Sequence, residues 1–85
     1  MKTVIEVSGE GLESLLGKRV LLLCANYFYV GTLVGVNEKC VKLQNPELVY
    51  ETGAWTDKAF ADAQALPADL YVQLNAIEAF MASSR

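Results

Sequence analysis

The sequence contains no histidine and only two cysteines among its 85 residues. Zinc and iron–sulfur sites are built from several Cys and His ligands, so Cys24 and Cys40 alone do not provide one. Each cysteine lies in an apolar, strand-like stretch, where a free cysteine behaves as a small hydrophobic residue. We therefore expect no disulfide framework, no metal site and no cofactor.

Positive charge is also scarce, because seven Lys and Arg face ten Asp and Glu, for a net charge of −3. Nucleic-acid-binding proteins usually present a basic face, since neutralising phosphates supplies much of their affinity. The longest uninterrupted apolar run, residues 20–25, is far shorter than the ~18 residues of a membrane span. No signal peptide is visible at the start of the sequence. The composition argues against a strong electrostatic nucleic-acid binder and predicts a soluble, cytoplasmic protein without a membrane partner.

Apolar residues are abundant, at 53% of the chain, against a typical ~45–50%. A chain of this length forms one small domain (residues 1–85), which buries only about 60–65% of its surface on folding. Oligomerisation is one way in which small domains gain core. The surplus of apolar side chains therefore predicts a homo-oligomer.

Residues 18–51 read as an antiparallel meander. Three β-prone runs, residues 20–24, 27–36 and 40–43, are separated by connections short enough to join antiparallel neighbours. Asn45-Pro46 is predicted to be a turn or a bulge in a strand that continues over residues 47–51. Gly31 and Gly35 lie inside the second run, where glycine marks a bend, a bulge or a close backbone approach. Long strands bent at glycine can curl into a small barrel.

The flanking segments complete this picture. Residues 1–9 are predicted to be a strand or an arm, and residues 10–17 a short helix with Leu12, Leu15 and Leu16 at helical spacing. Residues 52–68 form an insertion that is helical or irregular. Residues 69–80 form a last strand pair interrupted at Asn75, and residues 81–85 a frayed tail. The predicted fold class is mostly β, a strongly bent five-stranded antiparallel barrel.

No arrangement of residues supports catalysis. Glu47 and Glu51 fall on one face of an extended segment, but acid–base chemistry needs carboxylates that converge on a substrate in different environments. The aromatic cluster Tyr27-Phe28-Tyr29 is a candidate for stacking on a base, but adjacent strand residues point to opposite faces, so all three cannot form one platform and packing in the core or an interface is the alternative. We therefore predict that the protein is not an enzyme.

The segment Gly31-Thr32-Leu33-Val34-Gly35-Val36-Asn37 resembles the first signature of the Sm-like (Lsm) family, and residues 71–77 resemble the second in outline. The resemblance covers about residues 10–80. It implies a bent barrel that assembles into a ring through pairing of its fourth strand, here residues 69–74, with the fifth strand of a neighbour, residues 76–80. The subunit interface that this implies contains Leu70, Val72, Leu74, Ile77 and Phe80. An SH3-like or other five-stranded barrel remains open as an alternative.

The sequence departs from the family at its RNA-reading positions. Asn37 replaces the Asp of the first signature, and the base-reading Asn is missing where residues 40–42 stand. The remaining candidates for nucleic-acid contact are Asn37, Lys39 and Lys42, which imply a weak or altered RNA-binding or scaffolding role. The alternative function is a protein-interaction module without nucleic-acid binding. It would hold an unidentified protein with residues 53–66 through Trp55 and Phe60, because loops on rigid barrels often carry function and Trp is favoured at hot spots.

Overall fold

The apolar run at residues 20–24 forms a strand that is buried on both of its faces. In the computed structural model, which describes residues 11–85, this strand is β1 (Arg19–Cys24). Val20 and Leu22 belong to one hydrophobic core cluster, whereas Leu21 belongs to a second. Because side chains alternate along a strand, a continuous apolar run is what a strand with a core on each side requires. The strand or arm predicted for residues 1–9 lies outside the described residues.

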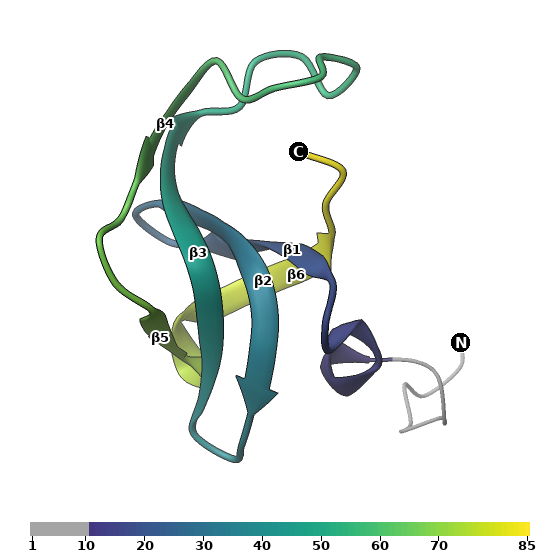
Figure 1. Cartoon of the computed structure of the whole chain (residues 1–85), viewed down its shortest axis with the longest axis vertical. Helices are drawn as coiled ribbons and strands as arrows, with labels where there is room; N and C mark the ends of the chain where they lie inside the picture. The colour runs from purple at the N-terminus through teal and green to yellow at the C-terminus, as the bar shows by residue number, and fades with distance from the viewer. Residues whose placement is uncertain (1–10) are drawn as a thin grey trace.

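Among residues 11–85, six strands form one antiparallel sheet with the order β4-β3-β2-β1-β6, and β5 pairs with β3 off this path. After β1 they are β2 (Phe28–Val36), β3 (Cys40–Glu51), β4 (Asp62–Ala65), β5 (Leu70–Gln73) and β6 (Ile77–Ala82). The first part of β3 pairs with β5 and its second part with β4. Figure 1 shows the resulting bend, with β1 and β6 running across β2 and β3. The meander predicted for residues 18–51 is therefore confirmed.

The predicted five-stranded barrel is wrong in two respects. The sheet has six strands, and it does not close: among residues 11–85, β6 pairs only with β1, while β4 and β5 pair only with β3. A 3-10 turn, η2 (Leu74–Ala76), carries the chain from β5 to β6. The Leu74 N–H donates to the Lys39 carbonyl at 2.8 Å, which anchors this turn. The strand–kink–strand arrangement predicted for residues 69–80 is confirmed.

A bulge lets β3 run as one twelve-residue strand. Val30 pairs with Glu47 and Thr32 with Gln44, so Gly31 alone stands opposite the two residues Asn45 and Pro46. Asn45 has a φ of 50°, a left-handed value that asparagine adopts more readily than most residues. An extra residue on one strand bends it and increases its twist. Of the two predicted possibilities at Asn45-Pro46, a turn or a bulge, the bulge is correct.

The helix predicted for residues 10–17 is not a regular helix in the described part of the chain, and of the two possibilities for the insertion, helical or irregular, the irregular one is correct. The described part of this segment, residues 11–17, contains only a four-residue 3-10 turn, η1 (Leu12–Leu15), whose leucines Leu12 and Leu15 pack against the first core cluster. Gly17, at φ 84°, donates its N–H to the Leu33 carbonyl at 2.7 Å and so starts the pairing of β1 with β2. The insertion consists of turns and bends followed by β4, and no helix among residues 11–85 is long and apolar enough to cross a membrane.

Candidate binding clefts at the open edge of the sheet

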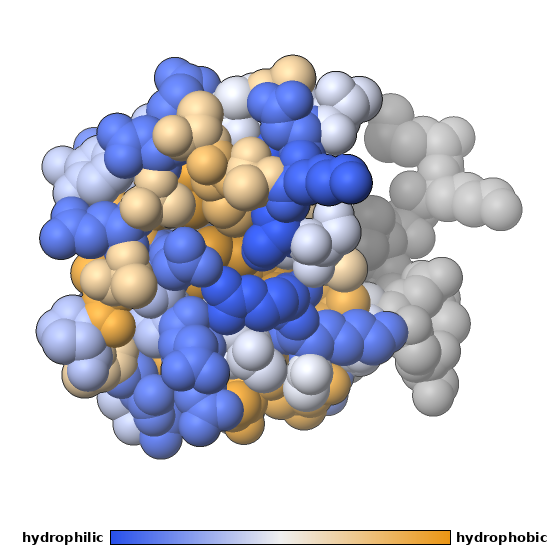
Figure 2. Space-filling view, turned by 45° about the horizontal axis from the view of Figure 1, so that its top comes forward, coloured by the Kyte–Doolittle hydropathy of each residue, from blue (hydrophilic) through white to orange (hydrophobic). Residues whose placement is uncertain are grey.

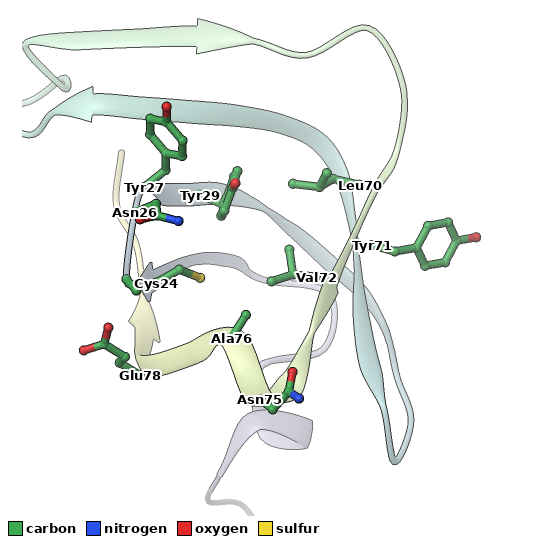
Figure 3. A pocket seen from close by; sticks show the side chains of 11 residues that line it. Cys24, Asn26, Tyr27, Tyr29, Leu70, Tyr71, Val72, Asn75, Ala76 and Glu78 are labelled. Atoms are coloured by element: carbon green, nitrogen blue, oxygen red, sulfur yellow. The ribbon is translucent and has the colours of Figure 1, made fainter.

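A cleft of about 450 Å³ lies beside β5, where the sheet fails to close. Figure 3 shows its walls, which come from the end of β1, the start of β2, β5 and the η2–β6 connection. Cys24, Leu70 and Val72 point into it and also pack in the first core cluster. The floor of the cleft is therefore an opening onto the hydrophobic core.

Two tyrosines share this cleft. Tyr27 and Tyr29 are two residues apart and both line it, whereas Phe28 between them packs on the second core cluster. Tyr27 is 46% exposed, and its ring meets Tyr50 edge-to-face at a centroid distance of 6.1 Å. Tyr71 of β5 points away from the cleft (Figure 3). The expectation that the three aromatics of residues 27–29 cannot form one platform is correct, and two of them do meet at one surface.

Among residues 11–85, the cleft is lined mostly by apolar and aromatic side chains, and Glu78 is its one charged residue. Burial, and after it the carboxylate of Glu78, raises the pKa of the Cys24 thiol. The thiolate is the nucleophilic form of cysteine, so Cys24 is a protonated, poorly reactive group at neutral pH. Within residues 11–85, neither a lysine nor an arginine lines this cleft. Its chemistry suits packing of an apolar or aromatic group rather than a covalent step or phosphate binding.

This state of Cys24 gives a testable prediction. In a Cys40→Ala background, iodoacetamide should label Cys24 more slowly than an unstructured cysteine peptide at the same pH. Glu78→Gln should raise the labelling rate, because it removes the negative charge that disfavours the thiolate. Mass spectrometry over time measures both rates. Equal rates for the folded protein and the peptide would contradict the burial of this thiol.

A second cleft, of about 630 Å³, lies at the turn between β2 and β3 and is bounded on its other side by β5 and η2. Glu38 and Lys39, which are adjacent in the sequence, both line this cleft. The Asn37 side-chain oxygen accepts hydrogen bonds from the backbone N–H groups of Lys39 at 2.7 Å and Cys40 at 2.9 Å. Asn37 therefore builds this turn, as Asn commonly does, and its oxygen is occupied within the chain.

Lys42, the third residue predicted to contact RNA, does not line this second cleft. It stands across from Tyr71 on β5, with its Nζ atom 5.5 Å from the ring centroid and 3.7 Å from the Asp69 carboxylate. Tyr71, and after it Asp69, raises the pKa of Lys42, so the ammonium stays charged. Of the three predicted RNA contacts, only Lys39 lines either of the two clefts.

The residues predicted for a subunit interface divide into two groups. Four of them pack against or within the core of their own chain: Leu70, Val72, Leu74 and Ile77. Phe80, in contrast, is 40% exposed on β6. Val72 is buried, Leu70, Leu74 and Ile77 are partly buried, and Phe80 alone of the five is exposed.

The residues predicted to bind a partner, Trp55 and Phe60, are brought together by Arg85. The Arg85 guanidinium lies over both rings. Phe60 also packs against the second core cluster, and Trp55 is 57% exposed. The prediction of a frayed tail at residues 81–85 is wrong, because β6 continues to Ala82 and Arg85 folds back onto the insertion. Sequence patterns gave no signal for Arg85, since its contacts join residues 25–33 positions apart.

Comparison of the chain with protein-family models, with curated proteins and with solved structures found no match. Function is therefore inferred from surfaces of the chain itself. These are the two clefts, the exposed strand β6 and the aromatic pair at Arg85.

Proposed function

We propose that this chain is a non-enzymatic, divergent Sm-like protein of the cytoplasm that assembles with copies of itself into a ring. The observation that carries the proposal is β6. Its sequence, Ile77-Glu78-Ala79-Phe80-Met81-Ala82, has a single charge, and all residues after Ile77 are exposed on both faces of the strand. Phe80 and Met81 are 40% and 42% exposed. Figure 2 shows hydrophobic residues reaching the surface between polar ones on the face that it presents.

An uncovered apolar edge strand is unusual in a protein that functions as a monomer. Edge strands present unpaired backbone groups, and natural proteins normally protect them with charges, prolines, bulges or a covering segment. Along β6, only Glu78 provides such a charge. The β4 edge differs, since Asp62 and Gln64 are exposed on a strand of four residues. The contrast supports β6 as an edge that a partner strand covers.

The partner edge in this proposal is β5 of a second copy. The Leu74 N–H bonds inward to Lys39 of the same chain, and bonding groups alternate in direction along an antiparallel pair. By this alternation Tyr71 and Gln73 present their backbone N–H and C=O groups to the free side of β5. Pairing of β5 with β6 of a neighbour would provide hydrogen-bond partners for the free backbone groups of both strands. It would also cover the exposed rings of Tyr71 and Phe80. Repetition of one such head-to-tail contact generates a ring if the rotation closes.

The native mass of the protein tests self-assembly. Multi-angle light scattering of nucleic-acid-free protein should give a discrete multiple of the 9.3 kDa chain mass. The mass should be the same at low and high salt, because apolar burial and backbone hydrogen bonds are weakly screened compared with exposed ion pairs. A monodisperse 9.3 kDa species would contradict the proposal.

We expect RNA binding by the assembly to be weak and to depend on Lys39. The net charge of −3 and the use of the Asn37 oxygen within its own turn support this view. A labelled oligo-uridine should show measurable affinity only at low salt, since single-strand binding falls with salt in proportion to the phosphates neutralised. Lys39→Gln should abolish that affinity, whereas Lys58→Gln, which removes a charge from the insertion, should not. Equal loss in both variants would reassign the effect to overall charge.

A second candidate function is supported by the 57% exposure of Trp55. A large aromatic side chain beside Phe60 and an arginine is the composition of a protein-interaction hot spot. In this case residues 53–66 would hold a partner protein, with or without the ring.

A further inference from the structure

Arg85 makes four separate contacts with the insertion. The centre of its guanidinium is 5.1 Å from the Trp55 ring centroid and 4.3 Å from the Phe60 ring centroid. Its Nη1 atom donates to the Thr52 carbonyl at 2.9 Å and to the Ala54 carbonyl at 3.4 Å. Two ring faces and two backbone oxygens therefore converge on one guanidinium.

The receiving loop is shaped by its own residues rather than by Arg85. The Gly53 N–H donates to the Glu51 carboxylate at 3.2 Å, and Gly53 adopts a φ of 70° that favours glycine. The Asp57 carboxylate accepts from the Ala54 N–H at 3.1 Å, while the Asp57 N–H donates to the Ala54 carbonyl at 3.0 Å. These bonds fix the backbone that presents the Thr52 and Ala54 oxygens. The loop is thus organised to receive a donor group independently of which donor arrives.

One wall of this site is rigid and the other is open. Phe60 packs against the second core cluster, whereas Trp55 is 57% exposed. Arg85 itself is held by little else. Apart from its contacts with the insertion, its only hydrogen bonds within residues 11–85 are with the Ser83 hydroxyl, two residues before it. A competing side chain can approach Trp55 from solvent, and Arg85 can leave without disturbing a strand.

We propose that Trp55, Phe60 and the carbonyl oxygens of Thr52 and Ala54 form an arginine-binding site that Arg85 occupies in the free protein and that takes an arginine side chain of a partner protein in exchange. The proposal deepens the second candidate function and does not depend on ring assembly. Arg85 acts as an internal competitor that keeps the site closed to weak ligands.

The chemistry of the site selects arginine over lysine. A planar guanidinium stacks on aromatic faces and presents several fixed N–H donors, whereas an ammonium is a compact, strongly hydrated point charge. Glu51, Asp57 and Asp62 outnumber the single Lys58 over residues 51–62, so the surroundings favour a cation. Within residues 11–85 Arg85 forms no ion pair, and recognition depends on the rings and the carbonyls.

The single tryptophan of the chain reports on this site directly. Three proteins should be compared: wild type, Arg85→Gln, which empties the site, and Arg85→Lys, which keeps the charge but not the planar fork. Trp55 fluorescence should differ between wild type and Arg85→Gln, and Arg85→Lys should resemble Arg85→Gln. An unchanged spectrum in Arg85→Gln would contradict the contact of Arg85 with Trp55 of the same chain. The wild-type spectrum should not change on dilution, and a change would place Arg85 of a second copy in the site instead.

Wild type and Arg85→Gln should then each be titrated with a short Gly/Ser peptide carrying one arginine, and with the same peptide carrying lysine. Arg85→Gln should bind the arginine peptide roughly 3–10-fold more tightly than wild type does, because an intramolecular competitor at millimolar effective concentration lowers the apparent affinity of a weak ligand. Neither protein should respond to the lysine peptide beyond the response of free N-acetyltryptophanamide. Failure of Arg85→Gln to bind, or equal affinities in the two proteins, would overturn the proposal. Neither result would alter the native mass that tests assembly.

Discussion

Replacing Gly31 by alanine should lower the free energy of unfolding by about 1–3 kcal/mol, the usual cost of overpacking a core. Gly31 is buried on β2 opposite the bulge at Asn45 and Pro46. A Cβ atom at this position would lie 2.9 Å from the Leu43 Cβ and 3.3 Å from the Gln44 carbonyl oxygen. The Gln44 oxygen is a backbone atom of β3, and the Leu43 Cβ is bonded directly to that backbone. Neither atom can therefore move aside by rotation of a flexible side chain.

Gly35→Ala is the matched control for this prediction. It lies on the same strand, and its added Cβ would meet only the Lys42 Cβ, at an ordinary contact distance of 3.5 Å. Gly→Ala substitutions that fit the native conformation stabilise by ~0.4–1 kcal/mol through the unfolded chain. Urea unfolding of the two variants at one fixed protein concentration measures the difference, since assembly makes stability concentration-dependent. Equal stabilities would show that Gly31 is not needed for the close approach of β2 and β3.

The meander could be predicted from sequence because its signals are local. Val, Leu, Tyr and Phe crowd the strands, the connections are short, and Gly31 marks the position where β3 comes closest. The continuous apolar run at residues 20–24 is also explained simply, because both faces of this strand are buried against hydrophobic clusters. Local pattern and tertiary structure agree there because each strand pairs with its neighbour in the chain.

Prediction failed where long-range packing decided the local conformation. Residues 62–65, Asp-Ala-Gln-Ala, have weak β propensity and form β4 only through pairing with β3. Phe60 and Ala63 are three residues apart, a spacing compatible with a helix, yet they reach the second core cluster from a loop and a strand. Leu12 and Leu15 likewise pack on the first cluster from a single 3-10 turn. In these cases the spacing of the apolar residues correctly indicated which side chains pack against the core, but it did not indicate their secondary structure.

The candidate sites show the same division. The sequence identified Tyr27 and Tyr29 only as members of an aromatic cluster, and the structure places both at one cleft because side chains alternate along a strand. The opposing wall of that cleft, at Leu70 and Val72, comes from β5 more than 40 residues away and could not be assigned from spacing. Arg85 was hidden for the same reason, because its partners lie 25–33 residues earlier. Local patterns identify residues that are able to bind, whereas the topology determines which of them meet.

Phe80→Pro should convert the proposed assembly into 9.3 kDa monomers without unfolding them. The Ser83 N–H bonds to the Arg19 carbonyl at 2.9 Å, so by alternation Met81 also bonds inward to β1, while Phe80 presents its N–H to the free edge of β6. Proline removes that one outward donor and is tolerated on an edge strand when its N–H side faces solvent. It therefore blocks addition of a neighbouring β5 and leaves the β1–β6 ladder intact.

Two further variants separate pairing from packing and from folding. Phe80→Ala keeps the backbone donor and loses only the ring, so it should weaken assembly without abolishing it. Met81→Pro removes a donor that faces β1 and should destabilise the fold itself, since proline inside a paired ladder costs a hydrogen bond. Light scattering gives the mass of each variant, and circular dichroism gives its folded fraction. If Phe80→Pro is folded and keeps the wild-type mass, β6 is not the assembling edge. If it is monomeric and Phe80→Ala is assembled, then the unpaired backbone of β6, rather than its apolar surface alone, holds the copies together.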